Sequence, residues 1–172
     1  MTATDILVPD TIPDHHRLIE EVFARYVRAA DRRDPAAMAA LFTDTATVAI
    51  HYRGGERPEV LAELTGAGTI GAAVTSGMAA HPPLGWSHHT LLNPIIDVAA
   101  GHGRFDAQFL VYAVRGLPQP DDGWPAGTVG AQGSIVPIES GYAHAELVLS
   151  GATWTIAHLV IEHDLPYAFP TP

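Results

Sequence analysis

The sequence contains neither cysteine nor lysine. Without cysteine there can be no disulfides, thiolate nucleophiles, cysteine-ligated zinc sites or iron–sulfur clusters. Without lysine, Schiff-base chemistry, covalent attachment of pyridoxal phosphate and the lysine of a phosphate-binding loop are also excluded. Ten histidines remain beside 19 acidic residues. Histidine and carboxylate side chains are therefore the groups that would supply acid–base chemistry near neutral pH.

Positive charge is also scarce. Nine basic residues, all arginine, stand against 19 acidic ones and give a formal net charge of −10. Nucleic acids and anionic membranes are bound by clustered positive charge, so we expect neither as a partner. No apolar run is long enough to cross a membrane, and the first ten residues lack the basic and apolar segments of a signal peptide. We therefore expect a cytoplasmic protein.

The length of 172 residues, with 47% hydrophobic residues, fits one domain with a single core. We expect an irregular N-terminal arm over residues 1–13, a domain over 14–165 and a C-terminal tail over 166–172. Residues 116–133 are rich in glycine, proline and aspartate and predict a long loop insertion between two strands. Trp124 lies inside this loop, which we interpret as a flap over a site, an oligomer contact or a solvated insertion.

Helical patterns are concentrated in the first half of the chain. Asp14 can cap a helix whose apolar residues recur in steps of one, three and four up to Ala30, and Pro35 marks the break that follows. A short second helix is expected over residues 36–42. The alanine-rich segment 59–80 favours another helix.

The remaining segments alternate in the manner of strands, over residues 45–52, 87–98, 104–115, 135–149 and 153–163. Helices gathered first and strands gathered last predict an α+β fold. We expect a cone-shaped, curved antiparallel β-sheet wrapped around the N-terminal helices. Such a cone encloses a pocket suited to a small apolar ligand.

Several segments resemble SnoaL-like proteins of the nuclear-transport-factor-2-like superfamily. They are YVRAADRRD over residues 26–34, LFTD over 41–44, HTLLN over 89–93, and the apolar alternation that follows Trp154. The resemblance covers roughly residues 14–165 and implies an α+β barrel. This superfamily includes dehydratases, dehydrohalogenases, isomerases, cyclases, oxygenase subunits and non-catalytic binding proteins.

Within the superfamily the sequence is most similar to scytalone dehydratase and its relatives. The resemblance implies that His89 is a catalytic histidine, that Asp31 is its carboxylate partner and that Tyr52 is a tyrosine of the pocket. The sequence GYAH over residues 141–144 also resembles this family. Three positions depart from the family pattern of tyrosine, histidine and asparagine, and hold Ala30, Ala107 and Leu147.

A paired histidine and aspartate make chemical sense without the resemblance. A carboxylate that accepts from one ring nitrogen fixes the tautomer and stabilises the imidazolium, so that the other nitrogen acts as a base. Helical spacing places Asp31 at the edge of the apolar stripe, where it could equally be a helix-end residue. His88 and His89 point to opposite faces of their strand, and His89 shares its face with Leu91. We predict a hydrogen bond between His89 and Asp31.

No serine lies in a nucleophile elbow, so the pair favours removal of a proton next to a carbonyl group. We predict a cofactor-independent lyase, such as a dehydratase, acting on a small apolar or polyketide-like carbonyl compound. An isomerase or cyclase, and a non-catalytic binding protein, remain alternatives. Tyr52 is either a hydrogen-bond donor to the carbonyl oxygen or a core residue.

The expected substrate contacts come from Tyr26, Trp86, Asn93, Phe109 and Leu147. No spacing typical of metal ligands is present, although Asp31, His51, His144 and Glu162 could in principle be brought together, so we expect no metal site. The resemblance also implies a homo-oligomer, either a dimer or a trimer.

Overall fold

The computed structural model describes residues 14–166 and 168. The arm expected over residues 1–13 and most of the tail expected over 166–172 lie outside the described residues. The described part contains three helices and six strands. They are α1 (His15–Arg32), α2 (Pro35–Ala39), β1 (Phe42–Tyr52), β2 (Glu59–Thr65), α3 (Ala67–Ser76), β3 (Gly85–Ala99), β4 (His102–Gly116), β5 (Gly133–Ser150) and β6 (Thr153–His163).

Helix α1 begins and ends where local chemistry favours it. The side chain of Asp14 accepts a hydrogen bond from the backbone N–H of Arg17 at 3.2 Å, which caps the first turn. The apolar stripe buries Ile19 and Phe23 against the sheet. The helix ends at Arg33, which adopts a left-handed conformation with φ of 54°. The predicted first helix is thus confirmed.

Residues 36–42 and 59–80 differ from the prediction. Helix α2 ends at Ala39 because Phe42 already opens strand β1. The segment 59–80 is half strand and half helix. Its first part pairs with β1 as β2, and Gly66, with φ of 89°, separates it from α3. Pairing with a neighbouring strand outweighs the helix propensity of the leucine, alanine and glutamate residues.

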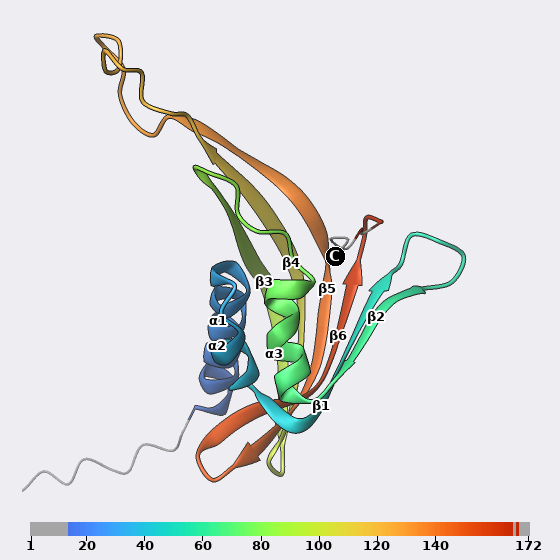
Figure 1. Cartoon of the computed structure of the whole chain (residues 1–172). Coiled ribbons are helices and arrows are strands. Elements are labelled where there is room, and N and C mark those ends of the chain that lie inside the picture. The colour runs from blue at the N-terminus through green and yellow to red at the C-terminus, as the bar shows by residue number, and fades with distance from the viewer. Residues whose placement is uncertain (1–13, 167, 169–172) are drawn as a thin grey trace, which may run out of the picture.

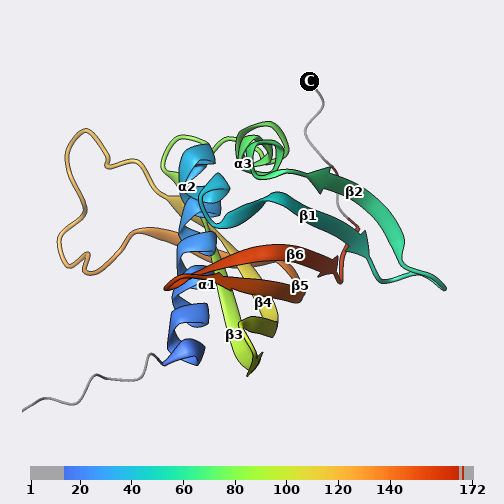
Figure 2. The same cartoon turned by 90° about the horizontal axis from the view of Figure 1, so that it is seen from below.

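The six strands form one sheet in the order β2-β1-β6-β5-β4-β3. The sheet curves around the helices, which lie on its concave side (Figures 1 and 2). All neighbouring strands are antiparallel except β1 and β6, which are parallel, and β6 lies between β1 and β5. The expected α+β fold with a curved sheet is confirmed. The sheet is mixed, however, and it stays open between its edge strands β2 and β3 instead of closing into a barrel.

The core lies between α1 and the concave face. Phe23 of α1 stacks on Phe105 of β4, with ring centroids 3.6 Å apart and planes within 11°. Leu147 is 1% exposed and packs in this core. The structure therefore places the predicted substrate contact Leu147 in the packed core, where it meets Ile19 and Trp154 around Gly103.

The predicted loop insertion joins β4 to β5 and projects far from the helices (Figure 1). Trp124 is 37% exposed in it. The function of the loop stays a prediction. Among the described residues, no helix combines the length and the apolar character needed to span a membrane.

Candidate active site

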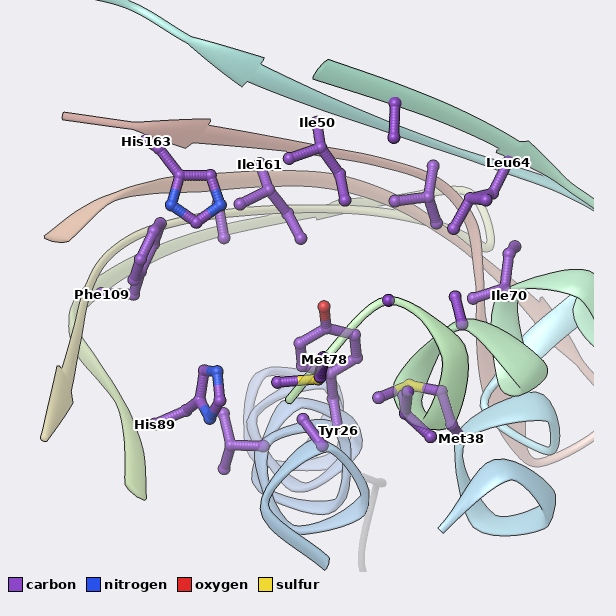
Figure 3. Close-up of a pocket in the computed structure, with 18 of the residues that line it drawn as sticks. Tyr26, Met38, Ile50, Leu64, Ile70, Met78, His89, Phe109, Ile161 and His163 are labelled. Atoms are coloured by element: carbon purple, nitrogen blue, oxygen red, sulfur yellow. The ribbon is translucent and has the colours of Figure 1, made fainter. Parts of the chain in front are cut away.

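A cavity of about 340 Å³ lies between helices α1 and α3 and the concave face of the sheet (Figure 3). Most of its wall is aliphatic or aromatic. Leu64, Ile70 and Ile161 are typical members of this apolar wall. Such a lining favours an apolar ligand oriented by a few polar groups. The polar side chains that line it are Tyr26, Ser76, His89, Glu139 and His163.

His89 and Asp31 are hydrogen-bonded to each other at the edge of the cavity. Nδ1 of His89 donates to Oδ1 of Asp31 at 2.6 Å, and the same oxygen accepts from the backbone N–H of His89 at 3.0 Å. Their side chains are only 17% and 11% exposed. Asp31 belongs to the last turn of α1 and His89 to β3, so the pair forms where the end of α1 meets the sheet edge. Asp31 is therefore both a helix-end residue and the partner of His89.

This geometry fixes the roles of the two imidazole nitrogens. A carboxylate can only accept, so Nδ1 carries the proton and Nε2 is left as the acceptor. Figure 3 shows the His89 ring pointing into the cavity. The pair therefore presents a basic nitrogen to an apolar space, with a carboxylate behind it that stabilises the imidazolium once a proton has been taken up.

Two other histidines surround Asp31 from outside the main cavity. Nδ1 of His88 lies 3.6 Å from Oδ2 of Asp31, but the His88 side chain is 57% exposed. Nε2 of His81 donates to the backbone carbonyl of Asp31 at 2.7 Å. The aspartate is thus held from several directions, while the ring of His89 is the one that faces the cavity.

Tyr26 supplies a polar group opposite the apolar wall. It comes from α1, and its hydroxyl points into the cavity (Figure 3). Burial raises the pKa of Tyr26 to about 12, so the hydroxyl stays protonated and can donate a hydrogen bond. The hydroxyl lies where it could contact a substrate in the cavity, so the substrate contact at Tyr26 stays a prediction.

Two further titratable residues line the cavity, Glu139 of β5 and His163 of β6. Sequence reasoning missed Glu139, and it left His163 as a weaker candidate because the inward face of its strand could not be fixed. Oε2 of Glu139 lies 3.8 Å from Nδ1 of His163. Burial raises the pKa of Glu139, whereas the charges of His89 and Arg33 act in the opposite direction. Burial and the charge of His89 lower the pKa of His163 to about 4, although Asp164 opposes the shift. Both shifts favour neutral side chains.

Of the other predicted substrate contacts, one lines the cavity and two lie outside it. Phe109 lines the cavity and packs edge-on against His163, with ring centroids 5.3 Å apart. Asn93 is exposed and has a positive φ of 51° next to a bulge, and its amide bonds to Gln108 outside the cavity. Trp86 is 39% exposed and stacks on His81 in a neighbouring hollow of about 140 Å³.

Tyr52 is the catalytic candidate that the structure places outside the cavity wall. It lies on the same side of β1 as Val48 and Ile50, which do line the cavity, but one step nearer the end of the strand. There its ring lies over Gly54, where any Cβ would collide with the tyrosine hydroxyl. The structure gives no support for the predicted contact between Tyr52 and the substrate carbonyl, because the ring lies against Gly54 and is not among the side chains that line the cavity.

Over residues 14–166, no group of three or more histidine, aspartate or glutamate side chains is arranged to hold a metal ion. His144 illustrates this. It bonds to Asp106 at 2.5 Å, but Glu162 lies 3.7 Å away on the other side of the ring. Asp31 and His51 do not join these residues in any such group.

Comparison with known proteins agrees with this architecture. The sequence profile of the SnoaL-like domain family matches residues 14–160. The chain belongs to the SnoaL-like domain family. No curated protein matches the chain at a significant level.

Solved structures share the fold at low sequence identity. A protein from Novosphingobium aromaticivorans, assigned as the beta subunit of an aromatic-ring-hydroxylating dioxygenase, aligns with a TM-score of 0.64 at 16% identity and covers 89% of this chain and 91% of its own. Aln2 from a Streptomyces species aligns at 0.60 and 16%, covering 89% and 93%. A nuclear-transport-factor-2-like protein with a cystatin-like fold, also from N. aromaticivorans, gives 0.58 and 16%, covering 86% and 80%. At these identities the likeness establishes the fold of this SnoaL-like protein.

Members of the SnoaL-like family include polyketide cyclases and subunits of ring hydroxylases. The family therefore joins several activities on one scaffold, and the activity of this member has to be argued from its cavity.

Proposed function

We propose that this SnoaL-like protein is a lyase that removes a proton from the carbon next to a carbonyl group of a small apolar molecule. Nε2 of His89 takes the proton, and the electron pair of the broken C–H bond moves into an enolate. Expulsion of a leaving group from the neighbouring carbon then completes an elimination. The observation that carries the proposal is the bond between His89 and Asp31 at the wall of an apolar cavity.

The aspartate makes the histidine an effective base in two ways. It holds the tautomer with the proton on Nδ1, and it stabilises the positive charge that forms on the ring during proton transfer. Both effects are strong here because the two side chains are largely shielded from water. A positioned general base contributes about 10²- to 10⁴-fold to the rate of proton transfer.

The enolate oxygen also needs a hydrogen-bond donor. Tyr52 is not among the side chains that line the cavity, whereas Tyr26 directs its hydroxyl into it (Figure 3). The raised pKa of Tyr26 keeps this donor protonated over the whole range in which a histidine is a base. We therefore assign the donor role to Tyr26. A donor that is already in place stabilises charge as it develops on the oxygen.

The size and lining of the cavity define the substrate class. A volume of about 340 Å³ accommodates a molecule of one to three rings, and the aliphatic wall favours an apolar skeleton. A single carbonyl oxygen placed near Tyr26 would bring an adjacent carbon toward His89. The substrate we propose is therefore a cyclic ketone or a related carbonyl compound with few other polar groups.

The proposal is tested by exchange of α-protons in D2O. 1-Indanone serves as the probe because it is a small apolar ketone, and proton NMR follows the loss of its C2 signal. The expected result is that the wild-type protein accelerates exchange over buffer and that His89→Ala lowers the protein-dependent rate by about 10²- to 10⁴-fold. His102→Ala, which changes an exposed histidine at the start of β4, is the control and should exchange like wild type.

A non-catalytic binding protein is the alternative that this assay separates. Such a protein would hold 1-indanone in the same cavity without accelerating exchange. If the wild type binds 1-indanone and the exchange rate equals that of buffer, the lyase proposal is wrong and the binding function is supported.

A further inference from the structure

The concave face carries a second group of titratable side chains in addition to His89 and Asp31. Strand register places His89 of β3, Val111 of β4 and Glu139 of β5 in one row across the sheet. The next row brings Phe109 and Gly141 beside His163 of β6. His89, Glu139 and His163 therefore share one surface, and all three line the same cavity.

The local packing explains how Glu139 and His163 come to face each other. Gly141 lies between Phe109 and His163, and a Cβ at this position would collide with the Phe109 ring and the backbone oxygen of Glu162. The absence of a side chain leaves room for the Phe109 ring, which packs edge-on against the His163 ring (Figure 3). His163 is thereby directed toward Glu139, at 3.8 Å. A half-buried carboxyl group and a buried imidazole are costly to desolvate, and the elimination as derived so far uses neither.

We propose that Glu139 is the general acid of this site, that it donates a proton to the departing oxygen once His89 has removed the proton from carbon, and that His163 is its positioning residue. The inference rests on the proposed lyase function and deepens it, because it defines the leaving group as a hydroxyl. Hydroxide is a poor leaving group and departs readily only when it is protonated.

The step balances as follows. The C–H bond next to the carbonyl breaks and its proton goes to Nε2 of His89. The bond between the neighbouring carbon and the hydroxyl oxygen breaks as the carbon–carbon double bond forms. The carboxyl proton of Glu139 goes to that oxygen, so that water leaves. A proton then passes from the imidazolium of His89 to the carboxylate of Glu139, through solvent, and restores the starting state.

The charges around Glu139 suit this sequence of events. Burial raises the pKa of Glu139 and favours its acid form before the reaction. The groups that face it are His89 from β3, Arg33 from the end of α1, and His163 from β6, with Asp164 beyond the histidine. The low pKa of His163 means that this ring brings no positive charge to Glu139 at neutral pH. Once His89 takes up a proton, its charge lowers the pKa of Glu139 and promotes release of the second proton.

The experiment compares three indanone probes that differ in their leaving group. 1-Indanone exchanges its C2 proton and loses no group. 3-Acetoxy-1-indanone loses acetate, which needs no proton, and 3-hydroxy-1-indanone loses hydroxide, which does. Both eliminations yield 1-indenone, which is measured by its absorbance and by chromatography. The variants are Glu139→Gln, which cannot donate an acid proton, Glu139→Asp, which keeps the acid on a shorter chain, and Glu146→Gln, an exposed control on β5.

The expected result for Glu139→Gln is a loss of about 10²- to 10³-fold with 3-hydroxy-1-indanone, but a change of less than about 3-fold with the other two probes. Glu139→Asp should recover part of the lost rate, and Glu146→Gln should match wild type with all three. His163→Gln should reduce the rate with the hydroxyl probe alone, and the 13C signal of the Glu139 carboxyl should then titrate at a different pH.

The outcomes distinguish the two proposals. If Glu139→Gln slows all three probes equally, or slows none of them, Glu139 is not the acid, although His89 can still be the base. If the wild type fails to exchange 1-indanone at all, the lyase function and the role of Glu139 fall together. The assignment would also be wrong if Glu139→Asp folds but lowers the rates with all three probes by the same factor.

Discussion

The free energy of unfolding should fall at acid pH because His163 is buried in its neutral form. The pKa of this histidine is lowered from its ordinary value of 6.5 to about 4, chiefly by burial. Between these values the unfolded chain binds a proton at this site and the folded protein does not. The contribution of His163 to stability is therefore fully present above pH 6.5 and is lost as the pH falls toward 4.

The size of this loss follows from the shift. Relative to neutral pH, the free energy of unfolding should fall by about 1 kcal/mol at pH 5.5 and by about 3 kcal/mol at pH 4 through this residue alone. Other groups titrate in the same range, so the measurement is a comparison with His163→Gln, which does not titrate. Urea unfolding of both proteins at pH 7.5, 5.5 and 4 should show a steeper loss for the wild type, by about these amounts.

His102→Gln removes an exposed histidine and serves as the control, since it should follow the wild-type curve. Parallel pH dependences for the wild type and His163→Gln would refute the reasoning, because they would mean that His163 takes up its proton equally well in the folded and unfolded states.

Three further changes give separate tests. Asp31→Asn should leave the fold intact but lower the exchange of 1-indanone by about 10²- to 10⁴-fold, because the amide favours the wrong imidazole tautomer; combined with His89→Ala it should be scarcely worse than His89→Ala alone. Leu147→Ala should lower the free energy of unfolding by about 2–5 kcal/mol in a urea titration, since Leu147 is fully buried, and a loss below about 1 kcal/mol would contradict its place in the core. Replacing residues 117–132 with a short turn should alter either the mass measured by light scattering or the affinity for 1-indanone, and no change in either would show that the loop is a solvated insertion.

Local signals in the sequence were sufficient for much of the fold. The capping aspartate and the apolar stripe define α1, and alternation defines β6 at the bounds that the structure shows. The hydrogen bond between His89 and Asp31 was expected, and the structure contains it. These features depend on residues close in the chain or, for the pair, on a pattern that the SnoaL-like resemblance carries.

The rest depends on how distant strands pair, which a single sequence does not show. Segment 59–65 has helical propensity, yet it becomes β2 because β1 offers it a partner. Glu139 lies in the same row of the sheet as His89 because the pairing of β4 with β5 is irregular there. Glu139 pairs with Val111 and Pro137 with Tyr112, so that Ile138 between them has no partner on β4. Alternation alone cannot place such a residue on the concave face.

The tyrosines show the same limit. Tyr52 shares the face of Val48 and Ile50, as the period of two predicts, but its ring lies against Gly54 and does not line the cavity. Tyr26 was expected only to contact substrate, whereas its position in α1 aims its hydroxyl at the cavity (Figure 3). The direction that each side chain takes decides these roles, and that direction follows from the packing around it.

The most direct test of the central claim measures affinity and chemistry in the same samples. Wild type and His89→Gln are each titrated with 1-indanone, so that NMR yields both the dissociation constant and the rate of α-proton exchange at saturation. If His89 is the base, the dissociation constants should agree within about 3-fold while the exchange rate at saturation falls by about 10²-fold or more in the variant. Equal exchange rates at saturation in the two proteins would contradict the claim, whatever their affinities.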